Sequence, residues 1–276
     1  MKYTYFQDQF VPTEEAKVPT SDRGFRFGDG VFETIRVENG KLYNVDFHLN
    51  RMTKGLMDVR IPLNASNLRG IARSLVKKNK IDRGFVRIMV SRGSGSEGYK
   101  PKAKHPTVVI ETIEGITTPA DSAKVMVTTQ KAAAIANAKT MNALHYTLAL
   151  CEAEDNDCDN AILLDDDGYV CEAASGNIFW IKDNILYTPS KKLEIIHGSI
   201  RQKVISLYKG DVVQGDFKMS RLEAADEAFI TNVNLLVLPI SEILPLNGAK
   251  GKVFKSIEKS LKIKKLVLDD IKSTLG

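Results

Sequence analysis

One lysine stands where an amine could carry out chemistry. Lys139 follows a run of small residues, 132–138, and precedes an apolar stretch that is expected to form a helix over 142–153. An amine at such a place is partly buried, and desolvation lowers the pKa of a lysine so that it can act as a nucleophile or a base. Taken alone, an ordinary exposed lysine explains this pattern better.

Three further features give Lys139 a chemical context. Glu172 ends an expected strand and is followed by small residues that leave room for a flat ring. Residues 198–201 open an expected helix, whose free amides can bind a phosphate, and Arg51 offers a guanidinium for the same anion. A lysine for an aldehyde, a carboxylate for a pyridine nitrogen and a phosphate cradle together predict a pyridoxal-phosphate pocket.

The same stretches resemble the fold-type-IV pyridoxal-phosphate enzymes, which include branched-chain and D-amino-acid aminotransferases and 4-amino-4-deoxychorismate lyase. The resembling segments follow the family order and cover most of the chain. They are residues 27–36, 48–51, 139–142, 165–168, 172–179, 187–189, 198–201 and 226–232.

The resemblance implies a role for each matching residue. Lys139 matches the Schiff-base lysine, which is the catalytic residue, Glu172 matches the partner of the pyridine nitrogen, and Arg51 matches the phosphate arginine. The turn at Asn232 lacks the hydroxyl that the family often offers there, so its backbone or amide would have to serve. The other cofactor-binding positions that the resemblance implies are Asn177, Ser199, Ile200, Asn232 and Val233.

Departures from the family pattern separate its branches. Ala143 stands where branched-chain aminotransferases have a tyrosine. Glu97 and Tyr99 stand where D-amino-acid aminotransferases have an arginine and a histidine for the substrate carboxylate. The loop 91–99 looks like that of the aminodeoxychorismate lyases, although Glu97 suits a dicarboxylate poorly.

We therefore predict a lyase that forms 4-aminobenzoate and pyruvate in the folate pathway. The alternative is an aminotransferase of the same fold, of the D-amino-acid or branched-chain type, and a more distant one is a non-enzymatic anion-binding module. The candidate substrate-binding residues are Phe27, Arg92 and Tyr99, with a surface role for Arg92 equally open. The expected substrate is a small anionic amine.

The chain is expected to have an α+β fold with two domains. Apolar residues at steps of three and four from Val45 predict one helix, and Ser66 is expected to cap a second. Many short β-branched runs, separated by Asp-Gly and Asp-Asn turns, follow in the second half. The predicted limits are 1–115 for the N-terminal domain, 116–123 for a linker, and 124–276 for a β-rich C-terminal domain carrying Lys139.

Composition restricts the expected class of protein and its location. The 276 residues include 39 Lys and Arg against 34 Asp and Glu, a net charge of +5 that gives no nucleic-acid signature. Three cysteines and the absence of a long apolar run favour a cytoplasmic protein without a disulfide framework or a membrane span. The resemblance implies a homodimer.

Two motifs resemble ligand-binding patterns, but we do not expect either to bind that ligand. Residues 93–98 match G-x-G-x-x-G, but the prolines at 101 and 106 forbid the helix that a dinucleotide site needs. Residues 155–166 copy part of a calcium loop, with Asn160 in place of the turn glycine and Asp166 in place of glutamate. The four histidines lack ligand spacing, so we expect no metal site.

Overall fold

The structure is a computed structural model that describes residues 1–95, 98–102, 105–117, 120–132, 138–246 and 251–276. The chain forms two compact units. Unit 1 consists of residues Met1–Ile116, Ala138–Ala143 and Thr274–Gly276, and unit 2 consists of Thr117–Asn137 and Leu144–Ser273. Both mix helices with strands, which confirms the predicted fold class.

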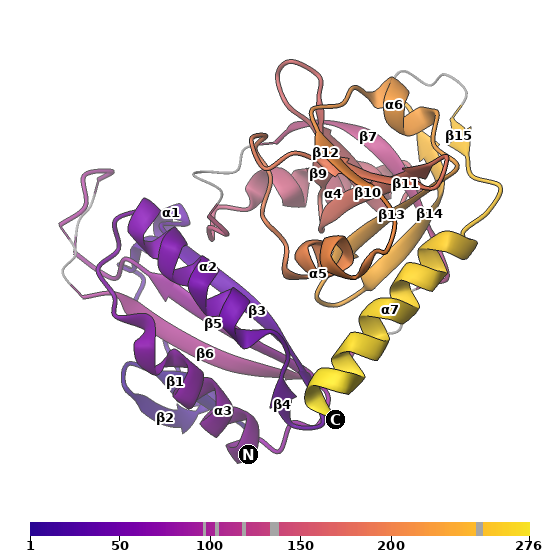
Figure 1. The fold of residues 1–276 in the computed structure, drawn as a ribbon. Helices are drawn as coiled ribbons and strands as arrows, with labels where there is room; N and C mark the ends of the chain where they lie inside the picture. Colours follow the sequence, from indigo (N-terminus) through magenta and orange to yellow (C-terminus); the bar gives the residue numbers. More distant parts are fainter. Residues whose placement is uncertain (96–97, 103–104, 118–119, 133–137, 247–250) are drawn as a thin grey trace. The chain divides into compact units, whose positions relative to one another are not determined.

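Unit 1 is an antiparallel sheet of six strands with helices on one face (Figure 1). The strand order is β2-β1-β6-β5-β3-β4. The strands are β1 (Tyr3–Phe6), β2 (Gln9–Pro12), β3 (Gly30–Glu38), β4 (Lys41–Leu42), β5 (Gly84–Ser91) and β6 (Thr107–Glu114). The helices are α1 (Arg23–Phe27), α2 (Val45–Asp58) and α3 (Leu68–Lys78), with short 3-10 helices η1 (Thr13–Glu15) and η2 (Ala65–Asn67).

Helix α2 follows the predicted stripe, because Val45, Met52 and Leu56 are buried against the sheet. The expected cap of α3 is wrong. Ser66 lies inside η2, where its amide donates to Oδ1 of Asn64, and α3 begins only at Leu68. The asparagine captures the free amide first, because its side chain reaches the backbone two residues on.

Unit 2 is a curled sheet of nine strands in the order β12-β11-β10-β13-β14-β7-β8-β9, with β15 paired to β14. The strands are β7 (Ala123–Lys131), β8 (Asn160–Leu164), β9 (Val170–Ala173), β10 (Asn177–Lys182), β11 (Ile185–Pro189), β12 (Val212–Gly215), β13 (Glu227–Asn232), β14 (Leu236–Leu244) and β15 (Lys252–Val253). The helices are α4 (Leu144–Asp155), α5 (Ser199–Leu207), α6 (Met219–Glu223) and α7 (Glu258–Leu275), whose last two residues belong to unit 1.

The curl of this sheet brings β9 back against β10 through a tight turn. Ala173 and Gly176 exchange two backbone hydrogen bonds, of 2.8 and 3.1 Å. A side chain at Gly176 would place its Cβ 2.3 Å from the carbonyl oxygen of Thr231, so the turn tolerates no other residue without a shift. Glu172 on β9 and Asn177 on β10 are thereby held close together.

The segment that carries Lys139 belongs to unit 1, which differs from the predicted C-terminal domain. The amide of Phe32 donates to the carbonyl oxygen of Lys139 at 2.9 Å, and the amide of Met141 donates to Gly30 at the same distance. Ala138 joins the apolar core of unit 1. Strand-like pairing with β3 therefore pulls this short segment away from its sequence neighbours. The other predicted domain limits stay predictions.

The segments with the G-x-G-x-x-G and calcium-loop patterns form mainly loops, turns and strands in the part that the structure describes. The loop after β5 shows no helix among the described residues between 92 and 106. Asp159 accepts the amide of Lys124, which joins the segment before β8 to β7, and Asp165 accepts the amide of Tyr169 within the turn between β8 and β9. The described residues hold no group of three or more His, Cys, Asp or Glu side chains suited to a metal ion.

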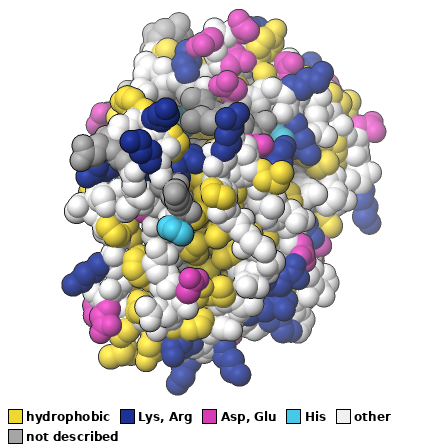
Figure 2. Space-filling model, turned by 90° about the vertical axis from the view of Figure 1, so that its left-hand side faces the viewer, with side chains coloured by type: hydrophobic (Ala, Val, Ile, Leu, Met, Phe, Trp, Pro, Cys, Tyr) yellow, Lys and Arg dark blue, Asp and Glu magenta, His cyan; other side chains and the backbone are white. Residues whose placement is uncertain are grey.

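No helix in the described part of the chain is both long and apolar enough to cross a membrane. On the face shown in Figure 2, basic side chains and acidic side chains are interspersed. The cytoplasmic location and the homodimer stay predictions.

Candidate active site

In unit 1, Arg51 is held by a buried carboxylate. Its Nε and Nη2 donate to the two carboxylate oxygens of Glu33, each at 2.6 Å, and Glu33 is 1% exposed. His48, one helical turn before Arg51 on α2, lies 2.6 Å from the same carboxylate through Nδ1. The guanidinium also lies over the Phe47 ring, 5.3 Å from its centroid. Arg51 therefore occupies a fixed position.

The charges of this cluster are set by their surroundings. Burial raises the pKa of Glu33, but the charge of Arg51 and the hydrogen bonds from Arg51 and His48 outweigh it and lower the pKa to about 2. Burial lowers the pKa of His48, despite the opposing effect of Glu33. At neutral pH an ionised Glu33 thus faces a charged Arg51 and a neutral His48 that donates its Nδ1 hydrogen.

Lys139 is partly buried in the same unit. Its Nζ atom lies 4.3 Å from the centroid of the Phe32 ring, on β3, which is an ordinary cation–π distance. Phe32 and Glu33 are neighbours along β3, so one strand positions both the lysine amine and the partner of Arg51.

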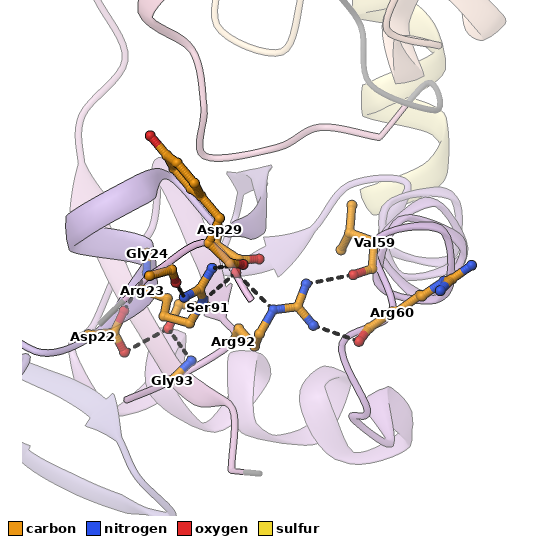
Figure 3. Close-up of polar contacts among 11 residues, drawn as sticks. Asp22, Arg23, Gly24, Asp29, Val59, Arg60, Ser91, Arg92 and Gly93 are labelled. Atoms are coloured by element: carbon orange, nitrogen blue, oxygen red, sulfur yellow. Dashed lines mark hydrogen bonds and ion pairs between the residues drawn. The ribbon is translucent and has the colours of Figure 1, made fainter. Parts of the chain in front are cut away.

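Each of the three guanidinium nitrogens of Arg92 donates a hydrogen bond within unit 1 (Figure 3). Its Nε donates to Oδ2 of Asp29 at 2.8 Å, while Nη1 and Nη2 donate to the carbonyl oxygens of Arg60 and Val59 at 2.8 and 2.7 Å. Arg23 donates to the same Oδ2 atom at 2.7 Å. Burial raises the pKa of Asp29, but these two arginines together lower it. This geometry ties β5 to α2 and favours a structural role for Arg92.

Phe27 and Tyr99, both predicted to bind substrate, lie next to each other. Their ring centroids are 5.6 Å apart, and Arg23 lies over the Phe27 ring at 4.8 Å. Arg23 also donates to the carbonyl oxygens of Gly98 and Tyr99, which holds the end of the glycine-rich loop against α1. Tyr99 is 87% exposed. The pair thus forms an accessible aromatic surface on unit 1.

In unit 2, Glu172 is the centre of a buried polar cluster. Its side chain is nearly inaccessible, with 2% of the residue exposed. The hydroxyl of Tyr146 on α4 donates to Oε1 at 2.5 Å, and Nδ2 of Asn177 and the amide of Ile196 donate to Oε2 at 3.2 and 3.1 Å. A buried carboxylate with several donors is stabilised in its charged form.

Asn177 connects this carboxylate to the beginning of α5. Its Oδ1 accepts the amide of Gly198 at 3.1 Å, and its Nδ2 also donates to the carbonyl oxygen of Ile196. Gly198 is the N-cap of α5 and makes no side-chain cap, so the amides of the first turn, at the buried Ser199 and Ile200, point outward along the helix axis. Such a helix end is a ready anion site.

The turn after β13 uses its asparagine side chain internally. Oδ1 of Asn232 accepts the amides of Asn234 and Leu235, at 3.0 and 2.7 Å, and its Nδ2 donates to the carbonyl oxygen of Ser175. The predicted contact of the Asn232 side chain with a cofactor therefore competes with three structural bonds. Val233 offers only its backbone for such a contact.

Three residues at the two candidate sites, one in unit 1 and two in unit 2, were not assigned a role from the sequence. Glu33 is the buried partner of Arg51, and a charged residue inside the apolar run of β3 was a signal for it. Tyr146 gave no signal, because its helix shows no clear apolar stripe. Thr231 is buried, and its hydroxyl has no hydrogen-bond partner among the described residues.

Comparison with known proteins gives the family that the sequence resembles. Residues 30–243 match the model of the class IV amino-transferases. A putative branched-chain-amino-acid aminotransferase of Methanocaldococcus jannaschii is 31% identical, with 94% of each chain covered. A D-alanine aminotransferase of Listeria monocytogenes is 29% identical over 89% of each chain.

Solved structures share the fold. The branched-chain aminotransferase of Escherichia coli superposes with a TM-score of 0.89 at 23% identity, covering 98% of this chain and 94% of that one. The 4-amino-4-deoxychorismate lyase of Pseudomonas aeruginosa gives a TM-score of 0.83 at 24% identity, covering 97% and 99%. The chain belongs to the class IV aminotransferase family, whose cofactor is pyridoxal phosphate.

The residues present fit that cofactor. Glu172 is a buried, hydrogen-bonded carboxylate of the kind that pairs with a pyridine nitrogen, and α5 begins without a side-chain cap. Thr231 is paired with Asn177 across β13 and β10, so its unpartnered hydroxyl lies on the same sheet face as the Asn177 side chain. A bound polar group would satisfy it. The role of each residue toward the cofactor stays a prediction.

Proposed function

We propose that this protein is a pyridoxal-phosphate-dependent aminotransferase that moves the amino group of a small amino acid to a 2-oxo acid. The observation that carries this proposal is the match of nearly the whole chain to relatives that are named as aminotransferases. Arg92, a candidate cation for the dicarboxylate substrate of a lyase, already donates a hydrogen bond from each guanidinium nitrogen, to Asp29 and to two backbone carbonyls. These structural bonds make Arg92 a weaker candidate for binding that substrate.

Relatives that cover most of the chain include proteins named as branched-chain and D-alanine aminotransferases. The lyase is a likeness at 24% identity, which supports the fold alone. The aminotransferase, which was the alternative in the sequence analysis, is therefore the better proposal.

The residues of the chain would divide the work. Bound pyridoxal phosphate supplies the electron sink that stabilises negative charge on the substrate carbon. Lys139 would bind the cofactor aldehyde through Nζ and then move a proton at the substrate carbon. Glu172 would hold the proton on the pyridine nitrogen, and the α5 amides with Arg51 would bind the phosphate. Phe32 keeps the Lys139 amine in a partly apolar setting.

The test is amino transfer by the purified protein with added pyridoxal phosphate. L-valine, L-leucine and D-alanine are supplied in turn as donors, with 2-oxoglutarate as acceptor, and the product amino acid is measured together with its chirality. We expect transfer from at least one donor, and loss of both activity and cofactor absorbance in K139A. K77A, an exposed lysine of α3, is the matched control and should behave as wild type.

A second arm addresses the lyase, which the absence of a tyrosine at Ala143 favoured. Aminodeoxychorismate is incubated without any acceptor, and pyruvate and 4-aminobenzoate are measured. Release of both products, with no transfer from the three amino acids, would overturn the proposal in favour of the lyase. A protein that binds no pyridoxal phosphate would contradict both enzymes.

A further inference from the structure

Both oxygens of Glu172 are held by donors from separate parts of unit 2. Oε2 receives the Asn177 side chain, from β10, and the Ile196 amide, from the connection that leads into α5. Oε1 receives the Tyr146 hydroxyl, from α4, in the shortest of these three bonds at 2.5 Å. A rotation of the carboxylate about its last bond would weaken the bonds at both oxygens together.

We propose that Tyr146 is a positioning residue that fixes Glu172 for the pyridine nitrogen of the cofactor. The proposal rests on the proposed function, because Glu172 has this task only when pyridoxal phosphate is bound. Tyr146 acts through the carboxylate and is not itself assigned a contact with the cofactor. Sequence motifs gave it no role.

The chemistry of Tyr146 suits this task. Burial, followed by the charge and hydrogen bond of Glu172, raises the pKa of the phenol above its usual range, so the hydroxyl remains a donor at any working pH. A phenol hydrogen bonded to a carboxylate at this distance is a charge-assisted bond, which is stronger than a neutral one. The rigid ring also confines the carboxylate sterically, because Tyr146 is set on a helix that packs on β7 and β8.

The packing of α4 on the sheet places Tyr146 within hydrogen-bond distance of the carboxylate. Glu172 is paired with Leu163 across β9 and β8, and α4 packs over β8. Buried Ala149 and Ala153 form the contact face of α4, so the helix lies close to the sheet. A large side chain one turn earlier, at position 146, is then long enough to reach the carboxylate oxygen.

The first test is the affinity of the apoprotein for pyridoxal phosphate in the Y146F variant. Phenylalanine keeps the ring and removes the hydroxyl, so we expect the Kd for the cofactor to rise about tenfold, as for the loss of one hydrogen bond to a charged group. Y208F is the matched control in the same unit. It removes a hydroxyl that donates to the carbonyl oxygen of Asn184, and its Kd should stay within about twofold of wild type.

A spectroscopic readout separates positioning from a general loss of stability. The absorbance and fluorescence of bound pyridoxal phosphate depend on whether its pyridine nitrogen is protonated, and Glu172 governs that proton in the proposal. We expect Y146F to change the spectrum of the bound cofactor and Y208F to leave it unchanged. Thermal unfolding of both apoproteins shows whether each variant folds.

A double-substitution cycle tests whether Tyr146 works through Glu172. In the E172A background the hydroxyl has no carboxylate to hold, so adding Y146F should change the Kd by less than about twofold. An equal tenfold effect in both backgrounds would overturn the proposal. So would a folded Y146F with the Kd and spectrum of wild type, while wild type itself binds the cofactor. A wild-type protein that binds no pyridoxal phosphate would overturn the proposed function and this inference with it.

Discussion

Arg51 and Glu33 form a bidentate ion pair in which each of two guanidinium nitrogens lies 2.6 Å from a different carboxylate oxygen. The carboxylate is buried on β3, and the arginine lies two turns into α2. The pair therefore joins the helix to the sheet and at the same time orients the guanidinium. The resemblance assigns the phosphate to Arg51, so the same two hydrogen bonds would serve both stability and cofactor binding.

Replacing Glu33 with glutamine should lower the stability of unit 1. E33Q removes the charge that compensates Arg51, and breaking a partly buried pair from one side costs about 3 kcal/mol. Urea unfolding at pH 7, followed by circular dichroism, measures this loss. E111Q is the control, because Glu111 meets Arg87 at a half-exposed site of the same sheet, and it should cost less than about 1 kcal/mol. Equal losses in the two variants would contradict the prediction.

The same cluster predicts how stability depends on pH. The pKa of Glu33 is lowered to about 2 in the folded protein from 4.5, so its contribution is present above pH 4.5 and is lost as the pH falls toward 2. This loss amounts to about 3 kcal/mol. The lowered pKa of His48 acts with the same sign, because the unfolded chain takes up that proton first as the pH falls. Thermal midpoints from pH 7 to pH 3 should fall more steeply for wild type than for E33Q.

Arg92 should behave as a structural residue. R92Q removes the ion pair to Asp29 and two bonds to carbonyl oxygens, so we expect a loss of about 2 kcal/mol, or about 5 °C in thermal midpoint. The KM for the amino donor should change by less than about threefold, since no substrate contact is removed. A KM raised tenfold at an unchanged thermal midpoint would instead restore the substrate-binding role predicted from the sequence.

Two glycine substitutions should separate cofactor binding from stability. A Cβ at Gly198 would lie 2.2 Å from Oδ1 of Asn177, which is already held by its neighbours, so G198A should displace Asn177 and weaken cofactor binding about tenfold or more. Gly70 on α3 has open space around a new Cβ, and G70A should stabilise the protein by about 0.5–1 kcal/mol without changing cofactor affinity. Cofactor titration and thermal unfolding of both variants check this. Weaker cofactor binding in G70A as well would show that the Gly198 effect is not local.

The sequence predicted those parts of the site that depend on residues close together in the chain. The helix that carries Arg51, the strand end at Glu172 and the opening of α5 at Gly198 follow from local periodicity and turn chemistry. The predicted cap at Ser66 failed because a nearer asparagine competed for the same amide. The lyase was favoured over the aminotransferase on Ala143 and on the residues of loop 91–99, although the sequence does not show which hydrogen bonds that loop forms.

What the sequence alone determined is the set of candidate groups: a lysine, a carboxylate, an arginine and a helix N-terminus in family order. The tertiary structure decided which side chains hold one another in place. Arg92 meets an aspartate 63 residues away, and Tyr146 meets Glu172 across 26 residues. Such pairings depend on strand register and on how helices pack, because a side chain's partner is set by the folding of distant segments onto it. For this reason the partners of Glu33 and Tyr146 emerged only from the fold.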